Sequence, residues 1–353
     1  MSLDPSLRQS LRDGFRLQAR VCEKTGAAVT AAILNGAGDE LIAPDGIFDP
    51  ILFDWTDRNP DAALSLRVMG ALHRLALEGR APRLAAILPS CGGTADVARV
   101  WPLAREVLAT QPDFIRSYLP RPPQTNEVGR SAMLLGGFLE IAAATGLPLR
   151  LFELGASAGL NLCWDHYRIE TSAFAWGPAN AELTLTCDWD GPLPRRPAEV
   201  RVLSRAGCDR NPSDLRNPDD LRRLESYIWP DQSHRVARLR QATQIAIREG
   251  IGLEQEEAET WLPRQLADVH RGATTVIYHS LFWPYLPEPT QSSLRTAIAN
   301  AGARAGIDQP VAWLRMELPN MRTLPELVLT LWPSGETRTL ATVHFHGQFV
   351  RWR

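Results

Sequence analysis

Lysine and long apolar runs are the two features that this 353-residue chain most plainly lacks. Lys24 is the only lysine among 38 basic residues, the formal net charge is -2, and like charges do not cluster. Because a surface that follows nucleic-acid phosphates needs clustered positive charge, we expect no general nucleic-acid binding. No apolar stretch reaches the roughly 20 residues that cross a bilayer, and residues 1–20 have no signal-type apolar core. We therefore expect a cytoplasmic protein without membrane contact.

Cysteine pairs of the kind that bind metals are also missing. The five cysteines are scattered and odd in number, without a C-x-x-C pair or a histidine at metal-ligand spacing: Cys22, Cys91, Cys163, Cys187 and Cys208. This pattern is typical of reduced thiols in a core or in loops, not of a disulfide framework. The sequence therefore predicts no metal site.

Two glycine-rich nucleotide motifs are absent as well. The chain has no G-x-x-x-x-G-K-[ST] segment, which excludes a nucleoside-triphosphate P-loop. The dinucleotide pattern G-x-G-x-x-G also fails, because Ser157 stands two residues after Gly155 and the next glycine is Gly159. These absences argue against a nicotinamide or flavin enzyme.

The remaining composition is that of an ordinary globular protein, with 44% hydrophobic and 22% charged residues. The first part of the chain carries apolar side chains at steps of three and four, such as Leu7 and Leu11, and this periodicity predicts helices. A proline cluster at residues 120–123 ends the pattern. We expect a helical N-terminal region at residues 1–120 on the substrate side and a second domain at residues 121–353.

Predicted strands alternate with predicted helices in this second domain. Apolar and β-branched segments indicate strands at residues 149–154, 200–203, 251–253, 274–281, 311–318, 327–332 and 339–351. This alternation favours an α/β, Rossmann-like, mostly parallel sheet that binds ligands at the carboxyl ends of its strands, and the last two strands indicate an antiparallel hairpin. A stretch rich in Trp, Pro and Gly at about residues 164–199 is expected to be an insertion at the sheet edge.

One predicted helix, at residues 125–145, contains two adjacent glycines, Gly136 and Gly137. Each glycine costs a helix roughly 1 kcal/mol relative to alanine. Close packing against a neighbouring strand would account for them. We therefore expect this helix to lie directly on the sheet.

The most informative segment is the run of small residues after the strand at residues 149–154. It is Gly155-Ala-Ser157-Ala-Gly159, so no side chain larger than a hydroxymethyl group shields the main chain there. A helix that starts near Ser157 would also point unpaired N–H groups at the same place, which suits a ligand carboxylate or phosphate. The sequence therefore predicts a small-molecule site at this turn.

The same residues match G-x-S-x-G, the nucleophile elbow of serine acyl hydrolases, in the expected strand and turn context. Ser157 would then attack an acyl group, with an acid and a histidine from later in the chain. The available partners are Asp209, Asp268, His279, His344 and His346. Because no HGGG-type oxyanion segment lies upstream, this hypothesis is an alternative.

Glu153-x-Gly155-x-Ser157-x-Gly159 resembles E/D-x-G-x-G-x-G, the first motif of class I S-adenosylmethionine-dependent methyltransferases, with serine in place of the middle glycine. Together with the string Gln-Thr-Asn-Glu-Val-Gly-Arg-Ser at residues 124–131, it also resembles an uncharacterised bacterial family known only as a domain of unknown function. The second resemblance covers most of the chain and implies no activity. The methyltransferase hypothesis therefore depends on individual residues.

The methyltransferase resemblance implies S-adenosylmethionine as cofactor and a small molecule as methyl acceptor. The cofactor contacts that it implies are Glu153, Gly155, Ala156, Ser157, Gly159, Asn161, Asp209, Glu257 and Ala258. Asp209 is the acidic residue that closes the second expected strand, where a carboxylate would bind the ribose hydroxyls. Glu257-Ala258 follows the third expected strand and would lie beside the adenine. His279 and Tyr285 belong to the cluster that would face the methyl group, and they are the catalytic candidates, with His279 as base.

Each of these residues also has a structural interpretation. Asp209 is placed to cap a turn, and Glu257 has acidic neighbours that suggest a solvated face. His279 has the alternative role of a hydrogen-bonded core histidine. Asn126 and Glu127 either cap their own helix or reach the pocket. A protein that keeps the pocket without catalysis is therefore a further alternative.

Overall fold

The computed structural model describes residues 4–43, 46–57, 63–196, 199–268, 270–320 and 323–353. The chain forms two compact units. The first comprises Met1–Thr125 and Arg216–Ala237, and the second comprises Asn126–Leu215 and Arg238–Arg353. No helix among the described residues is long and apolar enough to span a membrane.

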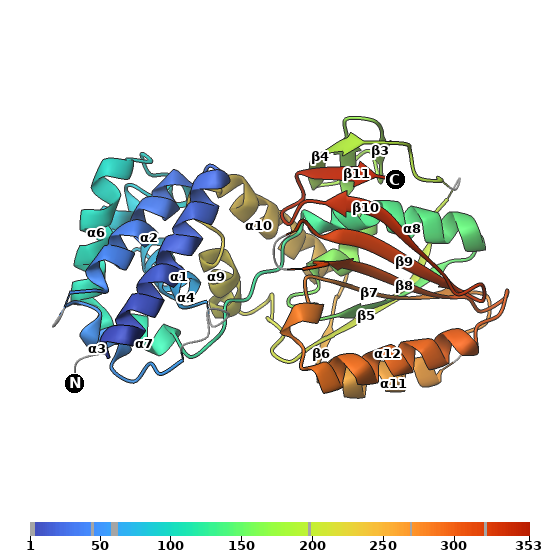
Figure 1. The fold of residues 1–353 in the computed structure, drawn as a ribbon. Coiled ribbons are helices and arrows are strands. Elements are labelled where there is room, and N and C mark those ends of the chain that lie inside the picture. The colour runs from blue at the N-terminus through green and yellow to red at the C-terminus, as the bar shows by residue number, and fades with distance from the viewer. Residues whose placement is uncertain (1–3, 44–45, 58–62, 197–198, 269, 321–322) are drawn as a thin grey trace. The chain divides into compact units, whose positions relative to one another are not determined.

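The first unit is helical (Figure 1). Its helices bury the apolar face that the periodicity predicts, with Leu7, Leu11 and Phe15 in the core. The helices are α1 (Pro5–Lys24), α2 (Ala28–Glu40), α3 (Asp49–Leu52), α4 (Leu64–Leu77), α5 (Pro82–Ala85), α6 (Val97–Thr110), α7 (Pro112–Tyr118) and α9 (Pro218–Ser226), with the 3-10 turn η2 (Pro89–Cys91). The unit thus includes α9, which lies well beyond residue 121 in the chain.

The second unit is built on a sheet that contains 11 strands among the described residues, in the order β3-β2-β4-β11-β10-β9-β8-β7-β1-β5-β6. The strands are β1 (Leu149–Leu154), β2 (Arg168–Thr171), β3 (Ala175–Trp176), β4 (Thr184–Asp190), β5 (Val202–Asp209), β6 (Leu253–Gln255), β7 (Thr274–Ser280), β8 (Val311–Glu317), β9 (Glu326–Trp332), β10 (Glu336–Val343) and β11 (Phe349–Trp352). The strands from β6 to β8 are parallel, and β9, β10 and β11 continue the sheet antiparallel. The predicted α/β class, with a largely parallel sheet and antiparallel C-terminal strands, is confirmed.

Helices cover both faces of this sheet (Figure 1). α8 (Arg130–Thr145) packs on one face, and α11 (Ala258–Ala267) and α12 (Glu288–Ala303) pack on the other. α10 (Ser233–Arg248) carries residues of both units. Because side chains alternate along a strand, Tyr278 of β7 meets Phe138 of α8, whereas Ile277 and His279 point toward α11 and α12.

The expectation that a helix starts near Ser157 is wrong. The turn leads instead into η3 (Leu160–His166), a 3-10 helix of 7 residues that begins only after Gly159. Gly159 is left-handed, with a φ of 74°, so the chain cannot enter a helix before it.

The expectation of a single strand at residues 339–351 is also wrong, because β10 and β11 are separate strands that pair with each other. The connecting loop contains Gly347, which has a φ of 83° and packs against the backbone of Gly129. Part of the expected insertion forms β2, β3 and β4 at one edge of the sheet. Residues 197 and 198 of that insertion lie outside the described residues.

Gly136 and Gly137 lie where α8 meets the sheet, as predicted. A Cβ atom at Gly136 would overlap the indole ring of Trp352 in β11, and one at Gly137 would overlap Leu314 in β8. The helix therefore approaches the sheet so closely that these two positions have no room for a side chain.

We predict that Gly136→Ala lowers the free energy of unfolding by about 1–3 kcal/mol, although alanine favours helices, because the rigid Trp352 ring must move. The matched control is Gly14→Ala in α1, where a Cβ would meet nothing within 4 Å. The free energy of unfolding of that variant should rise by about 0.5–1 kcal/mol. Urea unfolding of both variants checks this, and an equal effect of the two substitutions would contradict it.

Candidate functional site

The strand order reverses direction at β1, which places a potential ligand crevice there. From β1 the chain continues to β5 and β6 on one side, and it then returns to β7 and β8 on the other side. In open α/β sheets ligands bind outside the carboxyl ends of the strands at such a reversal. The small-residue turn at residues 155–159 follows the carboxyl end of β1 directly.

The turn after β1 contains three left-handed residues. Gly155, Ser157 and Gly159 have φ angles of 65°, 57° and 74°, and the value at Ser157 is strained for a residue with a side chain. The Ser157 N–H donates to Oδ2 of Asp209 at 2.9 Å, and its carbonyl accepts from the Ser213 N–H at 2.9 Å. These bonds hold the strained residue in place.

The Ser157 side chain is buried but has no partner. The residue is 6% exposed, and its Oγ makes no hydrogen bond to any described residue. A buried hydroxyl without a partner costs about 1–3 kcal/mol, so it calls for an explanation. A polar ligand atom at the turn would supply the missing bond.

The main chain of the turn is less bare than the sequence suggests, and the expectation that it is open at both glycines is wrong. A Cβ at Gly155 would overlap the ring of Phe282, and one at Gly159 would lie 2.8 Å from Cγ2 of Ile251. The two glycines are therefore required by the packing of the protein itself. A bulky residue at Gly159 would disturb that packing as well as any ligand.

The segment at residues 124–131 fixes the turn and the end of β7. Asn126 Oδ1 accepts the N–H of Leu160 at 2.8 Å, so the first N–H of η3 is already satisfied. Ser131 Oγ donates to Oδ1 of the buried Asn161 at 2.8 Å. Arg130 Nη1 donates to the backbone carbonyl of the last residue of β7 at 2.9 Å. The sequence analysis assigned no role to Arg130, although this residue belongs to the segment at residues 124–131 that carries the resemblance to the bacterial family.

Glu127 and Asn126 differ in what they hold. Asn126 braces the turn rather than its own helix, whereas Oε1 of Glu127 accepts the N–H of Gly129 just before α8 and also Nη2 of Arg238, both at 2.9 Å. Both residues therefore have structural partners in the second unit.

Glu153 is a buried carboxyl group on the α8 face of β1. It is 2% exposed, and the Tyr278 hydroxyl donates to its Oε2 at 3.2 Å. Burial raises the pKa of Glu153 to about 8, against the opposing influence of the Tyr278 hydrogen bond and of Arg130, while the charge of Asp209 adds to the rise. Glu153 is therefore largely protonated at neutral pH, and a nearby cation would favour its ionised form.

His279 is a fully buried histidine whose two ring nitrogens are both bonded. Trp313 Nε1–H donates to His279 Nε2 at 3.1 Å, so the proton is assigned to Nδ1, which donates to Oε1 of Glu317 at 2.6 Å. The ring also stacks on Trp283, with centroids 5.0 Å apart. This arrangement favours the structural interpretation of His279, which points away from Glu153 to the opposite face of the sheet.

Glu317 ends β8 and was missed by sequence reasoning. Its Oε1 accepts from His279 and from the backbone N–H of Phe282 at 2.9 Å, whereas Oε2 is buried without a partner among the described residues. An acidic residue at the carboxyl end of a parallel strand was the signal that identified Asp209. The same signal, applied to the strand at residues 311–318, finds Glu317.

The remaining predicted cofactor contacts either lie apart from this buried cluster or already bond to other groups of the protein. Oδ1 of Asp209 accepts the Asn211 N–H at 2.9 Å, so Asp209 braces two loop segments at the end of β5. Glu257 precedes α11 and pairs with Arg210 at 2.9 Å at the surface, while Ala258 is buried. Ala156 is also buried, and its N–H donates to a β5 carbonyl.

Tyr285 is not brought together with His279. It lies in the 3-10 turn η4 (Trp283–Tyr285) and is 78% exposed. For the hydrolase hypothesis, the unpartnered Ser157 Oγ means that no described histidine forms the serine–histidine hydrogen bond of a catalytic triad. Asp268 is exposed and pairs with Arg150.

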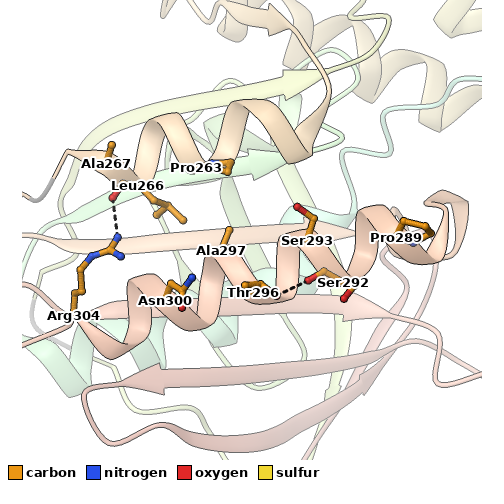
Figure 2. A pocket seen from close by; sticks show the side chains of 10 residues that line it. All are labelled: Pro263, Leu266, Ala267, Pro289, Ser292, Ser293, Thr296, Ala297, Asn300 and Arg304. Atoms are coloured by element: carbon orange, nitrogen blue, oxygen red, sulfur yellow. Dashed lines mark hydrogen bonds between the residues drawn. The ribbon is translucent and has the colours of Figure 1, made fainter.

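A separate groove of about 800 Å³ lies between α11 and α12 (Figure 2). Its lining residues are Pro263, Leu266, Ala267, Pro289, Ser292, Ser293, Thr296, Ala297, Asn300 and Arg304. None of them belongs to the predicted site, and the only charged one, Arg304, donates to the Leu266 carbonyl at 3.3 Å. This groove therefore offers no acid, histidine or cysteine for catalysis.

The fold and the cluster at β1 define an α/β protein with a buried polar site at the reversal of its strand order. A family model described as "Uncharacterized protein conserved in bacteria (DUF2332)" matches residues 12–352. The chain belongs to this family, which confirms the resemblance to an uncharacterised bacterial family. No significant match was found among curated proteins or solved structures. The methyltransferase resemblance stays a prediction.

We predict that Glu153 makes the protein less stable as pH rises. The unfolded chain loses the Glu153 proton near the ordinary glutamate pKa of 4.5, whereas the folded protein keeps it to a pKa of about 8. Between these values the folded state binds more protons, so the free energy of unfolding falls by up to roughly 1.4 kcal/mol per pH unit and levels off above about 8.

The glutamine side chain in Glu153→Gln cannot titrate, so the free energy of unfolding of this variant should lack this pH dependence. Urea unfolding at about pH 5, 6.5 and 8.5 measures the difference between variant and native chain, which should grow in favour of the variant as pH rises. Glu257→Gln at the surface is the matched control and should follow the native curve. Parallel curves for Glu153→Gln and the native chain would refute the assignment.

Proposed function

We propose that this protein binds S-adenosylmethionine at the carboxyl end of β1 and transfers its methyl group to a small molecule. The observation that carries the proposal is the turn at residues 155–159. It lies where the strand order reverses, it completes the E-x-G-x-S-x-G pattern that begins at Glu153 in β1, and it contains the buried, unpartnered Ser157 hydroxyl. A buried hydroxyl without a partner at a ligand crevice is accounted for by a bound polar molecule.

The residues at the turn suit the amino-acid part of this cofactor. Glu153, with Tyr278 beside it, is a buried carboxyl group that would accept an ammonium group. Ser157 Oγ would bond to a polar atom of the ligand, and Asp209 at the end of β5 keeps carboxylate lone pairs beyond its two backbone bonds. These three residues would hold the amino-acid group and the ribose.

The chemistry that the cofactor supplies when bound is an electrophilic methyl group. The contribution of this chain is then alignment of acceptor and donor, which can account for a large part of the rate of a displacement. We assign no general base, because both nitrogens of His279 are bonded within the protein. The proposal therefore favours an acceptor atom that needs no deprotonation by His279.

A second candidate is the serine acyl hydrolase. The observation in its favour is the positive φ of Ser157 on a turn that directly follows a strand, which is the strained geometry of a nucleophile elbow. Against it, Ser157 Oγ has no histidine partner among the described residues. A protein that binds the cofactor without transferring the methyl group is the third candidate.

We expect isothermal titration calorimetry to show saturable binding of S-adenosylmethionine and of its demethylated product to the purified protein. Glu153→Gln keeps the shape of the side chain but cannot ionise to pair with the ammonium group of the ligand, so it should weaken binding of both by about tenfold or more. Glu257 lies at the surface, so Glu257→Gln, which tests the predicted adenine contact, should weaken binding less than Glu153→Gln does. An absence of heat from folded native protein would refute the proposal, whereas binding without methyl transfer would favour the silent protein.

Ser157→Gly should separate the methyltransferase from the hydrolase. Glycine adopts the local φ of 57° without strain and removes the unpartnered hydroxyl, so we expect a gain in stability of about 1 kcal/mol. Loss of one ligand hydrogen bond should weaken cofactor binding by no more than about tenfold. Labelling of native Ser157 by a fluorophosphonate, with none in the variant, would instead establish the hydrolase. Ser157→Ala, which keeps the strain, is the control for stability.

A further inference from the structure

A second polar cluster lies in the helical unit, where α4 packs against α9. Arg67 and Gly70 are one turn apart on α4, and Arg223 and Tyr227 are one turn apart on α9 and its C-cap. A Cβ at Gly70 would lie 2.7 Å from the Tyr227 ring, so the glycine lets the two helices approach closely. This packing brings both arginines to the Tyr227 side chain.

The Tyr227 hydroxyl is buried and, as a donor, has no acceptor among the described residues. The residue is 7% exposed, and burial raises the pKa of Tyr227 to about 12, although Arg223, through its charge and a side-chain hydrogen bond to the hydroxyl oxygen, and the charge of Arg67 oppose this rise. The hydroxyl therefore keeps its proton at neutral pH. It is a buried donor without an acceptor, and this carries the cost of an unmade bond.

Arg223 is equally unusual, because it is 8% exposed and forms no ion pair with any described carboxylate. Its guanidinium lies 5.5 Å from the centroid of the Tyr118 ring, which is itself 5.8 Å from that of Tyr227. Buried arginines are normally paired. The nearby Asp219 acts on Arg223 electrostatically but is bonded to Arg74.

Arg74 and Arg67 complete the surroundings. Arg74 lies 5.9 Å from the Tyr118 centroid and is neutralised by Glu78 and Asp219. Arg67 donates to a backbone carbonyl and is influenced by the charge of Asp57, and burial together with Arg223 lowers the pKa of its guanidinium. The arginine groups that meet at Tyr227 are therefore hydrogen-bond donors.

We propose that Arg223, Arg67 and the Tyr227 hydroxyl form a binding site for a small oxyanion, a carboxylate or a phosphate group. An oxyanion accepts several hydrogen bonds at once, and its planar oxygen pair matches the fork of a guanidinium. It would bond the Tyr227 hydroxyl and neutralise Arg223, so both unmet requirements of the cluster would be satisfied by one ligand. This site is independent of the proposed cofactor site, since all of its residues belong to the first unit.

The test is the effect of anions on thermal unfolding of the full chain. Inorganic phosphate and acetate are each compared with chloride at equal ionic strength, and a saturable rise in Tm beyond the chloride value is expected with one or both, because a ligand that binds only the folded state stabilises it. A rise with phosphate alone identifies a phosphate site, and a rise with acetate alone identifies a carboxylate site.

Three variants locate the effect. Arg223→Gln should abolish the rise, and Tyr227→Phe, which removes only the hydroxyl group and should fold, should weaken anion binding at least about tenfold. Arg74→Gln is the matched control, because this arginine is already paired, and it should keep the rise. No anion-specific rise in the native chain, or an undiminished rise in Arg223→Gln or Tyr227→Phe, would overturn the proposal.

Discussion

The hydrogen bond from the Ser157 N–H to Asp209 is the interaction on which the rest of the site depends. It joins the turn after β1 to the end of β5, and it holds a serine in a conformation that favours glycine. Asn126 fixes the other end of the turn through Leu160. The turn at the strand-order reversal is therefore braced from both sides by contacts within the protein.

The sheet separates two polar networks at this edge. Glu153 and Tyr278 lie on the α8 face, whereas His279, Trp313 and Glu317 lie on the face of α11 and α12. A residue in one network reaches the other only through the strand ends and the loops after them. The strained Leu281, with a φ of 50°, lies in the loop after β7 and continues directly to Phe282 over Gly155. These loops are therefore the physical link between the two networks.

Local pattern sufficed for much of the fold. Periodicity found the helical first part and the central strands, and the cost of Gly136 and Gly137 in a helix correctly implied contact with the sheet. The position of Asp209 at a strand end was also accessible, because it follows from chain order alone. The separation of β10 from β11 could not be predicted in this way, because it depends on a contact between Gly347 and Gly129, which lie far apart in the sequence.

The site was harder to predict than the fold for the same reason. A glycine signals that a side chain is absent, but sequence alone does not show whether a ligand or another side chain such as Phe282 or Ile251 fills the space. A histidine likewise reveals its role only through its partners. His279 obtains them from β8, and that pairing is set by the register of two strands.

The last strand has a consequence for the order in which the protein is made. β11 lies between β10 and β4, and Phe349 pairs with Asp188 while Trp352 stacks on Trp189. During synthesis β4 leaves the ribosome long before β11 exists, so one of its edges stays open until β11 has been made. This part of the sheet therefore closes only when β11 pairs, and loss of β11 would leave β4 and β10 each with an exposed edge.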